Sequence, residues 1–120
     1  MSRDHRKLHI FGLADRLVFE IYEASKKFPA EERYGLRAEL RKAARSAATN
    51  IVEGCARRHH NEYVNFLNIA HGSASEVRYL ASVATRLNYI SRDVGGTLDR
   101  DYSELCAGLN SLIRSLDSRS

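Results

Sequence analysis

The sequence predicts an all-α protein: an antiparallel up-down-up-down four-helix bundle that assembles into a homo-oligomer. Four segments of the 120-residue chain carry apolar side chains at helical spacing. The single proline and the seven glycines leave room for long helices and argue against many short strands. Apolar side chains also recur on faces that four helices cannot bury among themselves, which predicts further subunits. We expect one domain over residues 1–120.

The first predicted helix spans about residues 8–27 and the second about residues 31–57. The first should end at Phe28-Pro29, because proline disfavours helical backbone in the residue before it. Its apolar face consists of Leu13, Leu17, Ile21 and Ala24. The apolar face of the second helix consists of Leu36, Leu40, Ala43, Ala47, Ile51 and Gly54.

The third predicted helix spans about residues 61–91, with Asn61 as its N-cap, and the fourth about residues 98–117. Between them, Asp93-Val94-Gly95-Gly96 has the composition of a turn. Short connections make neighbouring helices antiparallel, which predicts the up-down-up-down order. The apolar face of the fourth helix has the most regular spacing: Tyr102, Leu105, Cys106, Leu109, Leu112, Ile113 and Leu116.

A row of basic residues at four-residue spacing is the most distinctive polar feature. It consists of Arg33, Arg37, Arg41 and Arg45, joined by Lys42. Side chains four residues apart lie on one side of a helix, so these guanidinium groups repel one another unless anions neutralise them. The planar fork of arginine suits phosphate, which favours nucleic acid. The alternative is a solvated face, or salt bridges to glutamates of a neighbouring helix or subunit.

The distribution of charge agrees with an anionic partner. Residues 1–58 hold 13 Lys and Arg against 8 Asp and Glu, whereas residues 59–120 hold 6 against 7. Arg57 and Arg58, at the end of the second helix, would add to the basic row. We expect electrostatic, weakly sequence-specific binding of RNA or DNA.

A second polar row on the opposite shoulder of the second helix consists of Ser46, Asn50, Glu53 and Arg57. These side chains are expected to be half-buried and to need hydrogen-bond partners. Glu53 and Arg57 could act as an acid/base pair, but the pattern supplies no nucleophile, metal or oxyanion hole. We therefore interpret the row as a structural polar network and predict that the protein is not an enzyme.

The sequence predicts no metal, no cofactor and no membrane segment. The five histidines lack the spacing of metal ligands. Cys55 and Cys106 fall on apolar helical positions without CxxC spacing, which indicates a reducing compartment. No apolar run approaches ~18 residues, and the N-terminus lacks the apolar region of a signal peptide. We expect a cytoplasmic protein.

Apolar side chains outside the core faces predict the oligomer interface. On the first helix, Phe19 points away from Leu17 and Ile21. A helix with two apolar stripes usually buries both, and in a four-helix chain the second stripe needs another subunit. The second stripe on the third helix consists of Tyr79, Val83 and Ile90.

Several separated motifs resemble the bacterial four-helix-bundle proteins encoded in intervening sequences of large-subunit rRNA genes. The matching stretches are Phe28-Pro29, Glu32-Arg33-Tyr34-Gly35-Leu36, Leu40-Arg41-Lys42-Ala43-Ala44, Ser46…Asn50-Ile51-Val52-Glu53-Gly54…Arg57 and Phe66-Leu67-Asn68-Ile69-Ala70-His71-Gly72-Ser73…Glu76. The resemblance covers roughly residues 7–90. The chain departs from the family at Ala48, near which relatives often have proline, and this leaves open whether the second helix is kinked.

The resemblance implies a four-helix bundle and assembly into a homopentamer, and it does not imply an enzyme. The family is related to the accessory variability proteins of diversity-generating retroelements, in which a basic surface serves nucleic acid. A reverse transcriptase or another protein is therefore a further implied partner. We predict a non-enzymatic, oligomeric accessory protein that binds nucleic acid, and the alternative is a protein-interaction scaffold whose arginine row forms inter-subunit salt bridges.

Overall fold

The computed structural model describes residues 3–117 and contains, within that range, four α-helices and two short 3-10 helices, with no strand. The four long elements are α1 (His9–Ser25), α2 (Leu36–Cys55), α3 (His60–Arg86) and α4 (Arg92–Asp117). The 3-10 helices are η1 (His5–Lys7) and η2 (Ala30–Glu32). The predicted all-α class is therefore confirmed.

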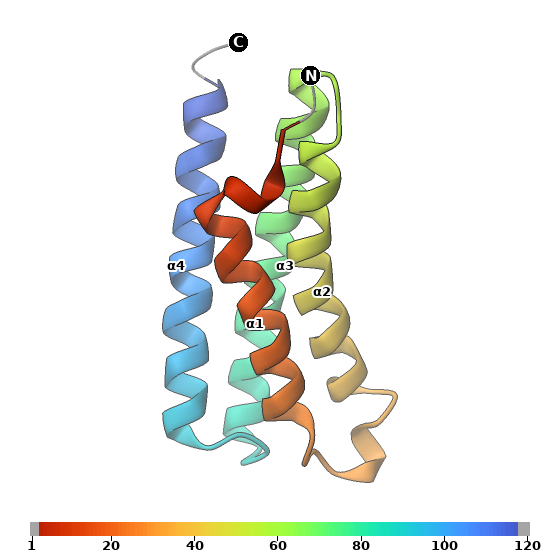
Figure 1. The fold of residues 1–120 in the computed structure, drawn as a ribbon. Helices are drawn as coiled ribbons and strands as arrows, with labels where there is room; N and C mark the ends of the chain where they lie inside the picture. The colour runs from red at the N-terminus through yellow and green to blue at the C-terminus, as the bar shows by residue number, and fades with distance from the viewer. Residues whose placement is uncertain (1–2, 118–120) are drawn as a thin grey trace.

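The four helices pack side by side as an antiparallel bundle (Figure 1). Each helix contacts its neighbours in chain order, and α1 also contacts α4. The diagonal pairs, α1 with α3 and α2 with α4, lie farther apart. The molecule measures 46 × 23 × 19 Å, because the helices lie along one common direction. The up-down-up-down topology is thus the one that the short connections predict.

The core consists of the apolar faces that the sequence indicates. Fully buried side chains come from all four helices, among them Leu17, Ile21, Leu40, Ile51, Leu67, Val77, Leu105 and Leu109. Full burial of a leucine or isoleucine side chain is worth about 1.5–3 kcal/mol. The contact between α2 and α3 is the most extensive, because small residues such as Ala43, Ala47, Ala70 and Ala74 let the backbones approach.

The predicted turn at Asp93–Gly96 is wrong, because α4 already begins at Arg92. Gly95 is buried in the first turns of α4, and its missing side chain leaves room for Thr85 of α3. The chain reverses direction earlier, at Asn88, whose φ of 65° lies in the left-handed region that asparagine tolerates. Consequently α3 ends at Arg86 and not near residue 91.

The start of α2 also differs from the prediction. Residues 31–35 form the end of η2 and a turn, and α2 begins at Leu36. A carboxylate oxygen of Glu32 accepts a hydrogen bond from the Leu36 backbone N–H at 3.0 Å, which satisfies one of the free donors at the helix start. From there α2 continues unbroken through Ala48 to Cys55. At the start of α3 the N-cap is His59, not Asn61.

Candidate nucleic-acid interface

The arginine row lies on α2 along its border with α1. Arg37, Arg41 and Arg45 occupy successive turns of α2, whereas Arg33 lies in the turn before the helix. Arg33, Arg45 and Lys42 are exposed, and Arg37 and Arg41 are half-buried. The predicted row therefore exists. Three of its arginines lie one turn apart on α2, and Arg33 extends the row beyond the N-terminal end of the helix.

Arg41 is held by the last turn of α1. Its Nε donates to Oγ of Ser25 at 2.8 Å, and its Nη2 donates to the backbone carbonyl of Tyr22 at 3.1 Å. The guanidinium carbon lies 4.5 Å from the centre of the Tyr22 ring. The last carbonyls of a helix have no partner within that helix, and a cation there is also favoured by the helix dipole. Arg41 thus caps α1.

Ser25 links this cap to the core. Its side chain is completely buried, and its hydroxyl donates to the backbone carbonyl of Ile21 at 2.7 Å. The Ser25 hydroxyl oxygen also accepts the hydrogen bond from Nε of Arg41. A buried hydroxyl that both donates and accepts is itself satisfied. Neither Ser25 nor Tyr22 was singled out from the sequence.

Arg45 lies one turn further along α2, and its Nη1 donates to the hydroxyl of Tyr22 at 2.6 Å. Tyr22 therefore contacts two arginines at once, one above its ring and one at its hydroxyl. Tyrosine faces and hydroxyls attract cations without neutralising them. The positive charge of Arg41 and Arg45 remains uncompensated by a carboxylate.

No carboxylate of residues 3–117 lies at ion-pair distance from the row. The ion pairs of this part of the chain involve other cations: Arg6, His9, Arg16, Lys26 and Arg78. Lys42 lies in a surface hollow that Glu39 and Glu76 also line. Intramolecular salt bridges therefore do not account for the row.

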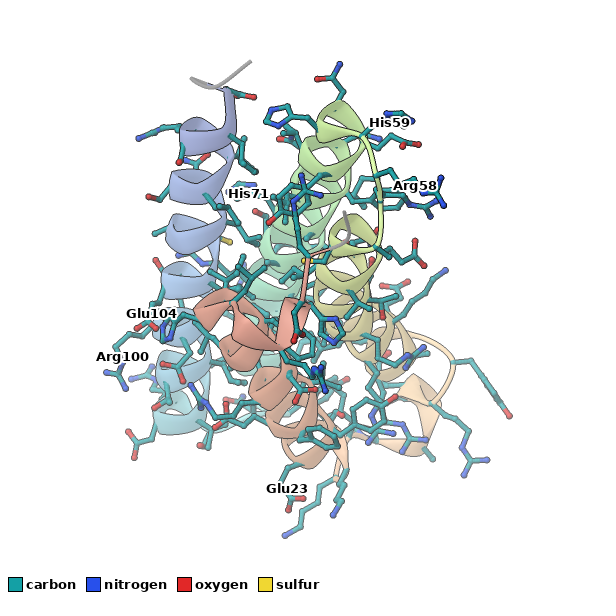
Figure 2. All side chains as sticks on the ribbon, turned by 45° about the horizontal axis from the view of Figure 1, so that its top comes forward. Glu23, Arg58, His59, His71, Arg100 and Glu104 are labelled. Carbon is teal, nitrogen blue, oxygen red and sulfur yellow. The ribbon has the colours of Figure 1, made fainter. Side chains whose placement is uncertain are left out.

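Arg57 and Arg58 lie at the far end of α2, in the connection to α3. Both are exposed, and the Arg57 guanidinium lies 4.7 Å from the centre of the Phe66 ring. Figure 2 shows Arg58 and His59 at this end of the bundle and Glu23 at the opposite end. From Arg45 to Arg57 the distance along a helix is about 18 Å at 1.5 Å per residue. These two arginines consequently form a basic cluster separate from the row.

Arg3 joins the cluster at this end, although 54 positions separate it from Arg57. Its backbone N–H donates to the Cys55 carbonyl at 2.8 Å, and its Nη1 donates to the Arg57 carbonyl at 3.2 Å. Its guanidinium lies 3.9 Å above the Tyr63 ring. Burial raises the pKa of the Cys55 thiol, which keeps it protonated and unreactive. Nothing in the sequence pattern connects Arg3 with this site.

The predicted polar network is smaller than expected. The Asn50 amide donates to the Ser46 carbonyl at 2.8 Å and to its hydroxyl at 3.1 Å, and the hydroxyls of Ser46 and Ser73 lie 2.8 Å apart. Glu53 and Arg57 are exposed and form no hydrogen bond with these side chains. Ser73, from α3, is the member that the sequence did not reveal.

The predicted apolar interface is only partly on the surface. Phe19 and Tyr79 are 69% and 63% exposed, but Val83 is half-buried against the core. Ile90 is only 4% exposed, so its assignment to an outward stripe is wrong. The reason is the reversal at Asn88, after which Ile90 no longer follows the helical spacing of α3.

Three further observations concern metals, membranes and curated relatives. Among residues 3–117, no group of three or more His, Cys, Asp or Glu side chains is placed to bind a metal ion. In the same part of the chain, no helix is both long enough and apolar enough to span a bilayer. The curated proteins include no match to this sequence.

A solved structure shows the same fold. It is a protein of unknown function from the S23 ribosomal protein family of Bacteroides thetaiotaomicron, with 23% identity and a TM-score of 0.81. The match covers 88% of this chain and 95% of that one. Residues 6–111 match the profile of a family described as 23S rRNA-intervening sequence protein. Because this match spans most of the sequence, the chain belongs to the 23S rRNA-intervening sequence protein family.

Proposed function

We propose that the protein is a non-enzymatic accessory factor that binds nucleic acid as a homo-oligomer, through the basic face of α2. The observation that carries this proposal is the absence of carboxylate partners for Arg33, Arg37 and Arg45 among residues 3–117. Like charges held one helical turn apart cost free energy, and an anion that binds them recovers it. Phosphates are the anions that arginine forks fit best.

The uneven distribution of charge between the helices supports the same proposal. Residues 36–58 contain six Lys and Arg against two Asp and Glu, whereas α4 contains three against five. Because α2 and α4 are a diagonal pair, the basic and the acidic helix lie at opposite corners of the bundle. A polyanion approaching the α2 side is therefore attracted without meeting the acidic helix.

The oligomer is the second part of the proposal. Tyr79 leaves most of its ring in solvent, and Ile69 on the same helix and Leu87 directly after it are 44% and 49% exposed. Burying these side chains between subunits would recover free energy in proportion to their apolar area. We propose a closed ring, a pentamer by family resemblance, which would present several copies of the basic face. The resemblance to retroelement accessory proteins makes a reverse transcriptase a candidate partner.

The charge of α4 favours a second candidate function, a protein-interaction scaffold. The acidic side chains of α4 could pair with the arginine row of the next subunit in a head-to-tail ring, since the two helices lie at opposite corners. In that arrangement the arginines would stabilise the assembly and would not be available to phosphates.

A salt titration of nucleic-acid affinity distinguishes the two functions. We expect the dissociation constant for RNA and DNA to rise steeply with salt, because each neutralised phosphate releases a condensed counterion. The double variant Arg33→Gln/Arg37→Gln removes two charges that no described contact uses. It should flatten the slope of log K against log salt by about 1.4–1.8 per bound chain.

The matched control is Arg100→Gln/Arg114→Gln, which removes the same charge from exposed positions of α4. The control should leave the slope unchanged, because α4 faces away from the row. Light scattering on the same samples reports the oligomer. Dissociation of the Arg33/Arg37 variant, with an unchanged salt slope, would support the scaffold and exclude the row as a phosphate site.

A further inference from the structure

We propose that the face formed by α1 and α2 binds single-stranded nucleic acid, with phosphates on the arginine row and unpaired bases stacked on Phe19 and Tyr34. This inference rests on the proposed nucleic-acid function and specifies its ligand. The sequence pattern alone indicated no stacking platform. The structure suggests one, because packing of α1 against α2 places the Tyr22 ring beside Arg41 and Arg45, and exposed aromatic residues lie near both ends of the row.

The first platform lies at the Arg45 end of the row. Tyr22 touches both Arg41 and Arg45, so its ring marks where the row meets α1. Phe19 precedes Tyr22 by three residues, and residues three apart are neighbours on one side of a helix. The Phe19 ring is 69% exposed, although it lies next to a half-buried tyrosine. A large apolar ring is thus held in solvent one helical turn from the tyrosine that contacts Arg41 and Arg45.

The second platform lies at the other end of the row. Tyr34 is 86% exposed and stands in the turn between Arg33 and the start of α2. Arg37 and Arg45 are separated by eight residues, or about 12 Å along the helix axis. The row is therefore a short ladder of cations with an exposed aromatic residue near each end. Its length corresponds to the short end of the ~4–16 nucleotides that single-strand-binding domains cover.

The shape of this face favours a single strand over a duplex. Two packed helices are about 18–22 Å wide, from an interaxial distance of 8–10 Å and a helix diameter of 10–12 Å. The major groove of B-DNA is about 12 Å wide and admits one helix. In a duplex the faces of the bases are also covered by their stacked neighbours. Exposed rings can stack only on bases that are unpaired.

Tyr79, an exposed aromatic residue on α3, can be compared with Phe19 within the same molecule. It is as exposed as Phe19, at 63%, but it lies on α3, which is diagonally opposite α1. The arginine beside it in α3, Arg78, is paired with Asp99 of α4 at 3.2 Å. The arginine next to Tyr79 is thus neutralised, whereas Phe19 lies one turn from Tyr22, which contacts two arginines that have no carboxylate partner. The inference therefore assigns Phe19 to the ligand and leaves Tyr79 to the oligomer interface.

The experiment uses the fact that the chain contains no tryptophan. Phe19→Trp and Tyr79→Trp each introduce one fluorescent reporter at an exposed aromatic position. Titration with a short oligouridylate should quench the reporter of Phe19→Trp, because stacked bases quench indole, and should leave that of Tyr79→Trp unchanged. A hairpin duplex of equal nucleotide content should quench neither. Phe19→Leu, which keeps an apolar side chain but no π face, should bind the single strand at least about five-fold more weakly.

The outcomes separate the inference from the function on which it rests. If duplex and single strand bind equally, with steep salt dependence and both reporters silent, the single-strand inference is wrong and the nucleic-acid function stands. Equal quenching of the two reporters would also overturn it, since the strand would then not be confined to this face. Absence of salt-dependent binding to either ligand would overturn both proposals.

Discussion

Two arginines that look equivalent in the sequence differ in what they do in the fold. Arg37 and Arg41 are one helical turn apart on α2 and both are half-buried. Arg41 donates hydrogen bonds to Ser25 and to the Tyr22 carbonyl, whereas no described residue forms an ion pair or a side-chain hydrogen bond with Arg37. One cation therefore stabilises the end of α1, and the other is available to a ligand.

Arg41→Gln should accordingly destabilise the protein, and Arg37→Gln should not. Loss of the hydrogen bonds from Arg41 leaves the buried Ser25 hydroxyl with one partner fewer, and we expect unfolding to become easier by about 1–3 kcal/mol. Arg37→Gln should change the free energy of unfolding by less than about 0.5 kcal/mol. Urea denaturation followed by circular dichroism measures both. Equal stabilities of the two variants would show that Arg41 does not cap α1.

At the scale of the elements, one glycine allows α2 and α3 to approach closely near the C-terminal end of α2. A Cβ atom added to Gly54 would lie 3.0 Å from Cβ of Phe66 and 3.3 Å from a ring carbon of Tyr63. Gly54 is therefore required where the two helices come close together. Gly72, in the middle of α3, is exposed and has no atom within 4 Å of an added Cβ. Its substitution meets no such obstacle.

The two glycines should respond to alanine in opposite directions. Gly54→Ala should lower the free energy of unfolding by about 1–3 kcal/mol, because α2 and α3 must move apart. Gly72→Ala should raise it by about 0.5–1 kcal/mol, since alanine loses less backbone entropy in a helix. Thermal unfolding of the pair provides the comparison. A stabilised Gly54→Ala variant would contradict the close approach of α2 and α3.

At the scale of the whole molecule, the faces differ in character. The α2 side is basic, α4 is acidic, and α3 carries exposed apolar side chains in Ile69, Tyr79 and Leu87. Such a division suits a subunit that contacts copies of itself with one face and an anion with another.

Light scattering should therefore report a closed homo-oligomer at micromolar concentration. Tyr79→Glu places a charge in the proposed subunit contact and should dissociate the assembly without loss of helical content. Asn110→Glu adds the same charge at an exposed position of α4 and serves as the control. A wild-type chain that sediments as a monomer would contradict the oligomer, and with it the ring of basic faces.

The sequence was sufficient for the fold but only partly for the site. Helical spacing identified the apolar faces because burial follows the 3.6-residue period, which is a local property. It placed the start of α4 too late, since Gly95 has the composition of a turn residue but lies within α4, where its missing side chain leaves room for Thr85 of α3. Helical spacing also predicted that Ile90 faces outward, because a periodic pattern cannot detect the chain reversal at Asn88.

The sequence by itself determined the helical class, the bundle core and the existence of a basic row on α2. The tertiary structure alone decided which arginines of that row are used by the fold. Tyr22 and Ser25 lie 19 and 16 positions from Arg41, and Arg3 lies 54 from Arg57, so no local pattern links them. Such contacts arise only when helices pack, because the packing fixes which side chains from distant segments share a surface.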